Sequence, residues 1–229
     1  MKILTLIKWS ADEIKGKGGY RGARSILARA VKKRRVLGET FDEATGLQTA
    51  GNTAIWRLDI ASRNAHLGED YQPTQEKNFQ AAFGELGLDY AKYVFIDLGC
   101  GKGKSIILAE AYDFARYVGI EFASDLVEIA RNNLRAANIK NAEMLCMDAA
   151  EFKFPESEFI LYMYNPFKAE VMQAVMRNLA LVRTDYYVVY WHAKQAHVLD
   201  ACVFLQRLET LMTDPPTLVW RGIASGERN

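Results

Sequence analysis

A glycine-rich segment in the middle of the chain carries the clearest chemical signal. It reads Asp97-Leu-Gly99-Cys-Gly101-Lys-Gly103, and it stands between an apolar run and a segment with helical periodicity. A turn from a strand into a helix presents unpaired backbone N–H groups, and glycines let a ligand approach that backbone closely. The segment therefore predicts a ligand-binding turn that begins with an acidic side chain.

Two common nucleotide-binding motifs do not fit this segment. Gly103-Lys104-Ser105 supplies the end of a phosphate-binding P-loop, but position 98, where that loop needs its first glycine, is Leu. The dinucleotide fingerprint G-x-G-x-x-G would require a glycine at Lys104 or at Ile106. The pattern that remains is D-x-G-x-G-x-G. Its acidic residue suits a cationic ligand and would repel a pyrophosphate.

Acidic residues also follow the next two apolar runs. Glu121 ends the run that starts at Tyr117, and Asp148 follows the run that ends at Cys146. A carboxylate can accept two hydrogen bonds from a vicinal diol, and ligands of open α/β sheets bind at the carboxyl ends of the strands. Three acids at three successive strand ends therefore predict one site. A solvated strand end is the alternative role for Glu121, and a helix N-cap is the alternative for Asp148.

A fourth apolar run ends in Tyr164-Asn165-Pro166-Phe167. The amide of Asn165 cannot act as a base, but its oxygen can accept a hydrogen bond from an amine and orient it. The rings of Tyr164 and Phe167 could flank a cationic group. The alternative is a strand-ending Asn-Pro turn with aromatic side chains in the core.

The elements that must position these residues follow from the apolar patterns. Short, continuously apolar runs predict parallel strands covered on both faces by helices, and they occupy residues 93–97, 117–121, 143–146, 158–163 and 186–191. Helices are expected after Ser124, taken as an N-cap, and over Ala169–Leu181. For the tail we favour an antiparallel hairpin of 203–211 with 217–221, and a helix over 203–211 is the alternative.

The glycine segment resembles the first motif of class I, seven-strand, Rossmann-like S-adenosylmethionine-dependent methyltransferases. The resemblance implies an α/β fold with a doubly wound, mostly parallel seven-stranded sheet. It also implies that Asp97 holds the methionine amino group, that Glu121 binds the ribose hydroxyls and that Asp148 contacts the adenine amino group. The remaining cofactor-binding residues that we assign from this resemblance are Gly99, Gly101, Gly103, Phe122, Ala149 and Asn165.

Two further segments resemble parts of this family. Tyr164-Asn165-Pro166-Phe167 is similar to the Asn-Pro-Pro-Tyr/Phe motif that amino-group methyltransferases place beside the transferred methyl, although one proline is missing. Tyr71-Gln-Pro-Thr74 resembles a segment that folds over the cofactor in compact microbial enzymes, including protein-lysine methyltransferases. A helix start with Thr74 as N-cap is the alternative. The favoured acceptor is a nitrogen, with a protein lysine ahead of a small amine.

Composition and charge limit the other possibilities. Half of the 229 residues are apolar, and 29 basic residues face 28 acidic ones, so a disordered chain and a strongly nucleic-acid-directed charge are both disfavoured. We expect residues 1–74 to be a mostly helical extension or lid and residues 75–229 to be the methyltransferase domain. The basic run Arg29–Arg35 could grip RNA, and a solvated helix face is the alternative.

Three scattered cysteines and three isolated histidines indicate a reducing compartment and no metal site. The absence of any 18-residue apolar stretch favours a cytoplasmic protein without a membrane span. Other functions stay open at this stage: a small-molecule or RNA methyltransferase, or a catalytically inactive protein that binds S-adenosylmethionine. A dinucleotide-dependent oxidoreductase is disfavoured because the fingerprint is missing.

Overall fold

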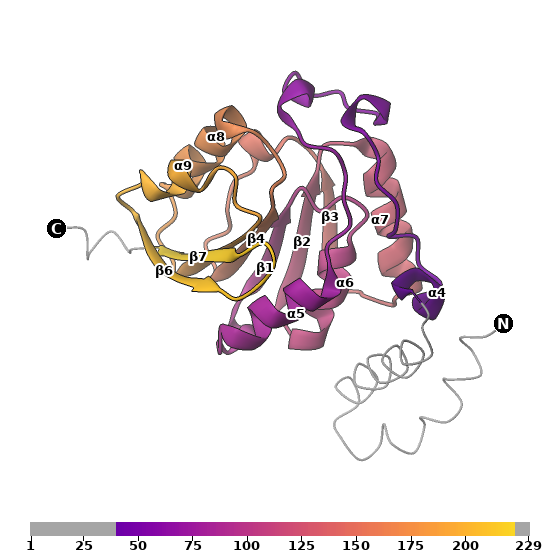
Figure 1. Cartoon of the computed structure of the whole chain (residues 1–229), viewed down its shortest axis with the longest axis horizontal. Helices are drawn as coiled ribbons and strands as arrows, with labels where there is room; N and C mark the ends of the chain where they lie inside the picture. The colour runs from indigo at the N-terminus through magenta and orange to yellow at the C-terminus, as the bar shows by residue number, and fades with distance from the viewer. Residues whose placement is uncertain (1–39, 223–229) are drawn as a thin grey trace, which may run out of the picture. The chain divides into compact units, whose positions relative to one another are not determined.

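The computed structural model describes residues 40–222 (Figure 1). The chain divides into two compact units, residues 1–47 and residues 48–229. Of the first unit the structure describes the short helix α4 (Phe41–Thr45). Its start is a capping box, in which the Thr40 hydroxyl accepts the Glu43 N–H and the Glu43 carboxylate accepts the Thr40 N–H. The basic run Arg29–Arg35 lies outside the described residues.

The second unit is built on a seven-stranded sheet with the order β3-β2-β1-β4-β5-β7-β6. Its strands are β1 (Val94–Leu98), β2 (Arg116–Glu121), β3 (Ala142–Cys146), β4 (Phe159–Tyr164), β5 (Tyr186–Trp191), β6 (Leu205–Leu211) and β7 (Thr217–Gly222). The first five pair in parallel, and β7 is antiparallel to both β5 and β6. This arrangement confirms the doubly wound, mostly parallel α/β sheet. It also confirms the C-terminal hairpin and excludes a helix over 203–211.

The sheet changes direction of winding at β1, which has β2 on one side and β4 on the other. Leu98, the last residue of β1, lies opposite Ile120 and Met163 in those neighbours. All five parallel strands therefore end at the same edge of the sheet, beside the switch point where open α/β sheets bind ligands.

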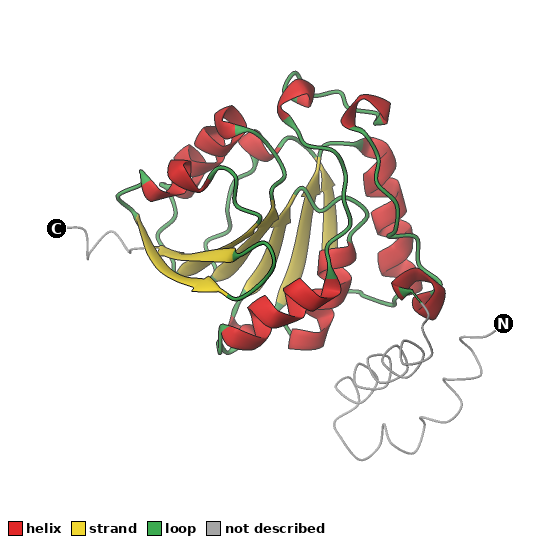
Figure 2. Cartoon of the chain, in the orientation of Figure 1, coloured by secondary structure: helices red, strands yellow, loops and turns green. Residues whose placement is uncertain are grey.

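Helices cover both faces of this sheet (Figure 2). They are α5 (Glu76–Glu85), α6 (Lys104–Ala109), α7 (Ser124–Ala136), α8 (Ala169–Leu179) and α9 (Ala196–Asp200). Five short 3-10 turns complete the list: η1 (Ile55–Arg57), η2 (Ala65–Leu67), η3 (Tyr90–Lys92), η4 (Glu110–Tyr112) and η5 (Ala149–Glu151). Residues 48–74 thus contain only η1 and η2 joined by loops, and they belong to the same compact unit as the sheet.

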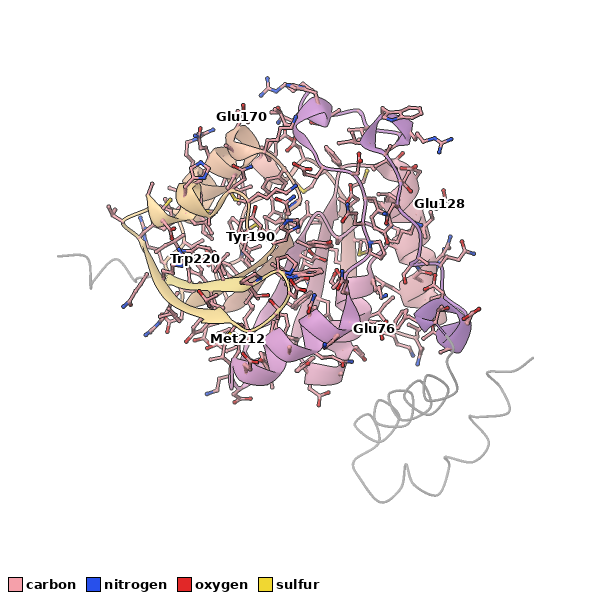
Figure 3. The ribbon with its side chains drawn as sticks, in the orientation of Figure 1. Glu76, Glu128, Glu170, Tyr190, Met212 and Trp220 are labelled. Carbon is pink, nitrogen blue, oxygen red and sulfur yellow. The ribbon has the colours of Figure 1, made fainter. Side chains whose placement is uncertain are left out.

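The two faces of the sheet are packed with different side chains. Under α8 and α9 the core is largely aliphatic, although it also holds Tyr190 and Trp220, both fully buried (Figure 3). Under α5 the core is aromatic, with Phe79 stacked on Phe83 at 4.4 Å between ring centroids and both rings against Phe95 of β1. Burial of large apolar side chains on both faces stabilises the strands whose ends carry the acidic residues.

The expected helix cap at Ser124 is wrong, and so is the alternative cap at Thr74. The helix α7 begins at Ser124 itself, and the Ser124 hydroxyl instead donates to Asp59 Oδ2 at 2.6 Å. The cap position of α5 is Gln75, one residue after Thr74, and its side chain makes no capping hydrogen bond. Ser124 bonds to a residue of another segment, and Thr74 lines the cavity at the edge of the sheet.

Candidate functional site

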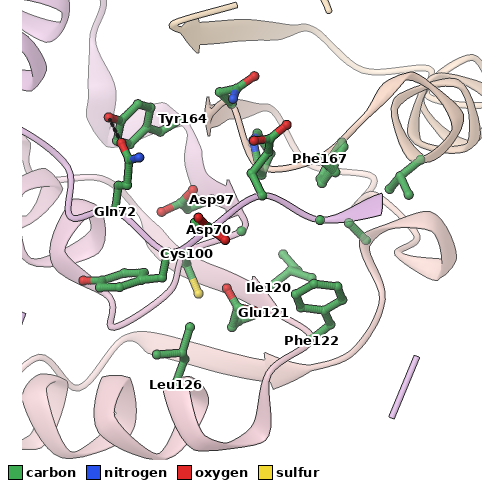
Figure 4. Close-up of a pocket in the computed structure, with 18 of the residues that line it drawn as sticks. Asp70, Gln72, Asp97, Cys100, Ile120, Glu121, Phe122, Leu126, Tyr164 and Phe167 are labelled. Atoms are coloured by element: carbon green, nitrogen blue, oxygen red, sulfur yellow. Dashed lines mark hydrogen bonds between the residues drawn. The ribbon is translucent and has the colours of Figure 1, made fainter. Parts of the chain in front are cut away.

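A cavity opens at the carboxyl edge of the five parallel strands (Figure 4). It is lined by the loops that follow β1 to β5 and by part of the segment 58–74, which covers them. The cavity brings together most of the site residues expected from the sequence: Tyr71, Thr74, Asp97, Gly99, Glu121, Phe122, Asp148, Ala149, Tyr164, Asn165, Pro166 and Phe167. Gly101 and Gly103, which were also expected there, do not line it.

The glycine turn is tightly packed against two neighbouring segments. Gly99 and Gly101 have φ of +80° and +51°, in the left-handed region that side chains rarely adopt. A Cβ atom at Gly101 would lie 2.3 Å from Cε2 of Tyr71, and one at Gly99 would lie 2.5 Å from Cβ of Pro166. The glycines therefore let the Tyr71 ring and the loop after β4 approach the backbone, which explains why Gly101 faces Tyr71 instead of the cavity.

Asp97 is the acidic residue of this turn and is only 3% exposed. The Ser105 hydroxyl donates a hydrogen bond to its Oδ2. Burial raises the pKa of the Asp97 carboxyl to about 7, against the lowering effect of the Ser105 hydrogen bond. Within residues 40–222 no lysine, arginine or histidine forms an ion pair with this carboxyl. A buried carboxyl without a cation favours a ligand that brings one.

Glu121 fastens the glycine turn to the end of β2. Its Oε2 accepts the N–H of Gly101 at 3.0 Å, and its Oε1 accepts the N–H of Ala123 at 3.0 Å. Burial raises the pKa of this carboxyl, and the backbone N–H groups counteract the shift. Each carboxylate oxygen has a second lone pair, so the group can hold the turn and accept a ligand hydroxyl at the same time.

Asp148 has three partners of its own in the structure. Its Oδ1 caps η5 by accepting the N–H of Ala150 at 2.8 Å, which is the alternative role that the sequence left open. Its Oδ2 accepts hydrogen bonds from the Ser62 hydroxyl and from Asn64 Nδ2, the latter at 2.8 Å. Sequence reasoning missed Ser62 and Asn64, because no local pattern connects residues more than 80 positions apart. The expected contact with an adenine amino group stays a prediction.

Asn165 lies at the end of β4 with its side chain turned into the structure. It is 7% exposed and has φ of +38°, an uncommon backbone conformation for a residue with a side chain. Its Oδ1 is buried and has no hydrogen-bond partner within the described part of the chain. Buried polar atoms are almost always paired. An unpaired amide oxygen in the wall of a cavity therefore indicates an acceptor for a ligand donor.

Aromatic and polar side chains of the segments beside Asn165 line the same cavity. Tyr164 stacks on Trp191 at 4.0 Å between ring centroids and donates its hydroxyl to Gln72 Oε1 at 3.0 Å. His192, which follows β5, lines the same cavity and has φ of +52°. Phe167 is 6% exposed and joins the aliphatic core, so it supports the wall more than it faces the opening.

The covering segment is attached to this wall through its backbone. The N–H of Glu69 donates to the carbonyl of Pro166 at 3.1 Å, and Gly68 forms an isolated β-bridge with Phe167. The hydroxyl of Tyr71 donates to the carbonyl of Thr49 at 2.6 Å. Sequence reasoning identified Tyr71 and missed Glu69, whose carboxylate pairs with Lys194 at 3.8 Å beside the opening.

Between residues 40 and 222, no three His, Cys, Asp or Glu side chains gather closely enough to hold a metal ion. No helix in that part of the chain is long and apolar enough to cross a membrane.

Comparisons with known proteins relate this chain to methyltransferases. Residues 95–185 match the family model described as a methyltransferase domain. No curated protein sequence matches the chain. Among solved structures, an RNA methyltransferase from Salinibacter ruber in complex with S-adenosylhomocysteine is similar at a TM-score of 0.50 and 23% identity. The match covers 67% of this chain and 95% of that one.

Two further solved structures share the fold. A putative methyltransferase from Escherichia coli matches at a TM-score of 0.54 and 15% identity, covering 76% of this chain and 100% of its own. A ribosomal protein methylase from Lactobacillus delbrueckii subsp. bulgaricus matches at 0.50 and 14%, covering 68% and 90%. The family model and these structures confirm the resemblance to class I S-adenosylmethionine-dependent methyltransferases, and they do not determine the acceptor.

Proposed function

We propose that the chain transfers a methyl group from S-adenosylmethionine to a nitrogen acceptor, with a protein lysine favoured over a small amine. The observation that carries this proposal is the buried, unpaired Oδ1 of Asn165 in the same cavity as Asp97 and Glu121. When bound, S-adenosylmethionine supplies an electrophilic methyl carbon and leaves as S-adenosylhomocysteine.

The residues of the cavity fit this cofactor at both of its ends. The buried carboxyl of Asp97 suits the ammonium of the methionine part, and the carboxylate of Glu121 suits the two ribose hydroxyls. Asp148, Phe122 and Ala149 line the part of the cavity where the adenine would lie. The site would bind the cofactor through these groups without a metal ligand.

Asn165 would orient the acceptor. Its Oδ1 accepts one N–H of the amine, which fixes the direction of the nitrogen lone pair toward the methyl carbon. Tyr164, stacked on Trp191, presents an aromatic face beside this position, and such a face stabilises a cationic amine or a sulfonium. The acceptor ammonium would first lose one proton to solvent, which frees the nitrogen lone pair. The N–C bond would then form as the S–C bond of the cofactor breaks, with the electron pair of that bond left on sulfur.

The charge beside the opening supports an amine over a polyanion. Glu69 and Asp70 both line the cavity, and Asp70 accepts the N–H of Ile55 at 2.9 Å. Lys194 pairs with the Glu69 carboxylate, so the Asp70 carboxylate is the group that attracts an ammonium and repels a nucleic acid phosphate. RNA is the alternative acceptor, because the sequence contains the basic run Arg29–Arg35. The test must therefore distinguish methylation of an amine from methylation of RNA.

The test has two stages. Calorimetric titration with S-adenosylhomocysteine should give micromolar binding, and NAD, the control, should give none. Labelled S-adenosylmethionine is then offered with three acceptors in parallel: a mixture of lysine-rich proteins, a polyamine and total RNA. Label recovered as methyl-lysine after acid hydrolysis supports the proposal. Label in RNA alone overturns the lysine assignment, and absence of cofactor binding overturns the function.

A further inference from the structure

Lys104 is a largely buried lysine in the wall of the cavity, directly after the glycine turn. Its side chain is 12% exposed, and its Nζ lies 3.4 Å from Oε1 of Glu76, whose side chain is 9% exposed. Glu76 stands at the start of α5 and is labelled in Figure 3. The other lysine that lines the cavity, Lys194, is 48% exposed and pairs with Glu69. Of the two lysines that line the cavity, Lys104 is therefore the less exposed one.

A buried ion pair is costly for the fold. Removing both charges from water costs several kcal/mol per ion, and an apolar pair of similar volume is often as stable or more stable. A lysine kept at this depth in a cavity wall is therefore better explained by a ligand than by stability. Its ammonium has three donors, so Glu76 can hold it in place while it also serves a ligand oxygen.

The position of Lys104 relative to Asp97 suggests the chemistry of that ligand. The two residues flank the glycine turn, with Asp97 near the end of β1 and Lys104 at the start of α6, and both line the cavity. One anionic and one cationic side chain on either side of one short turn complement an α-amino acid, which carries an ammonium and a carboxylate on one carbon atom. Thr74, 7% exposed, lines the cavity as well and adds a hydroxyl.

We propose that Lys104, positioned by Glu76, binds the carboxylate of the methionine part of the cofactor, while Asp97 binds its ammonium. This inference rests on the proposed function, and it adds a specificity determinant to it. The pair makes the site discriminate the intact cofactor and its product from adenosine thioethers that have no amino acid group.

Two ligands test this inference without knowledge of the methyl acceptor. S-Adenosylhomocysteine carries the amino acid group, and 5′-methylthioadenosine has the same nucleoside and sulfur without it. In Lys104→Met, the Kd for S-adenosylhomocysteine should rise about 10- to 100-fold, the range expected for loss of a hydrogen bond to a charged group. The Kd for 5′-methylthioadenosine should change less than twofold, and this binding also shows that the variant is folded.

Three further variants make the result specific. Lys77→Met removes a charge from the exposed neighbour of Glu76 and should leave both affinities unchanged. The double variant Glu76→Gln with Lys104→Met avoids an unpaired buried carboxylate and should show the same selective loss. Lys104→Arg retains the cation and should recover part of the affinity.

The inference is overturned if Lys104→Met binds S-adenosylhomocysteine as tightly as the wild type does. It is also overturned if both ligands weaken equally, since that would mean a structural role. Wild-type protein that binds neither ligand would instead refute the proposed function, and the role of Lys104 with it.

Discussion

Lowering the pH should weaken the binding of S-adenosylhomocysteine, because the Asp97 carboxyl must be ionised to pair with the ligand ammonium. Burial raises the pKa of this carboxyl to about 7, from an ordinary value of 3.8. The difference of roughly three pH units corresponds to about 4 kcal/mol for ionising a buried carboxyl that has no ion-pair partner within residues 40–222. The ammonium of the ligand supplies the missing partner and drives the proton off.

The expected size of the effect follows from this pKa. Each pH unit well below 7 costs a factor of ten in affinity, so the Kd should be about 50-fold higher at pH 5 than at pH 7. The amino group of the ligand stays largely protonated over this range, because α-amino groups titrate at about 7.7–8.0. Calorimetric titrations in half-unit steps from pH 5 to 7 measure the slope directly.

Asp97→Asn is the matched control for this profile. The variant should bind S-adenosylhomocysteine weakly at every pH and show little slope. A wild-type Kd that is constant from pH 5 to 7, or a slope that survives in Asp97→Asn, would refute the role of Asp97. Glu121, the other buried carboxyl of the site whose pKa burial raises, would then be the group to examine.

Stability without ligand gives an independent readout with a definite sign. A carboxyl whose pKa is higher in the folded than in the unfolded chain makes the free energy of unfolding fall as the pH rises, here between about 4 and 7. Asp97→Asn removes this penalty. Its Tm should therefore exceed that of the wild type by about 5–10 °C at pH 8, and the difference should shrink toward pH 4.

Three other substitutions test the site. Gly101→Ala places a Cβ 2.3 Å from Tyr71 Cε2 in a left-handed backbone conformation, so calorimetry should show at least about tenfold weaker S-adenosylhomocysteine binding; unchanged affinity in folded protein would contradict the packing. Glu121→Ala removes the acceptor of the Gly101 and Ala123 N–H groups. Adenosine-containing ligands should bind about 1–3 kcal/mol more weakly in the same titration, whereas equal affinity would exclude the ribose contact. Asn165→Ala should lower labelled methyl transfer about tenfold or more and change the S-adenosylhomocysteine Kd less than twofold; lost binding would mean a structural role.

The sequence predicted the strands well because their signal is local. Residues 186–191, for example, read as a continuous run of β-branched and aromatic residues, and β5 occupies the same positions. The acid at the end of β2 was likewise predictable, since a strand end and a glycine turn fix where Glu121 must lie. Both features depend on neighbours within one element and its adjoining turn.

The hydrogen-bond partners of polar side chains were much less predictable. Ser124 has the residue type of a helix cap, but Asp59 lies close enough in the fold to take its hydroxyl. Asp148 is held by Ser62 and Asn64 from a loop that carries no recognisable motif. Lys104 follows the glycines as the lysine of a P-loop would, and its burial against Glu76 depends on the packing of α5 beside α6. Such pairings depend on tertiary structure.

The attachment of residues 48–74 has a consequence for the rate of the reaction cycle. This segment bonds through its backbone to the loops that follow β2 and β4, where the Ser124 N–H meets the Asp59 carbonyl at 2.9 Å and the Lys168 N–H meets the Leu67 carbonyl at 2.8 Å. Those loops adjoin Glu121 and Asn165. A bound nucleoside would therefore restrain the same loops to which the segment is hydrogen-bonded. We expect departure of S-adenosylhomocysteine past this segment to require these bonds to open, so that the residence time of the product limits turnover.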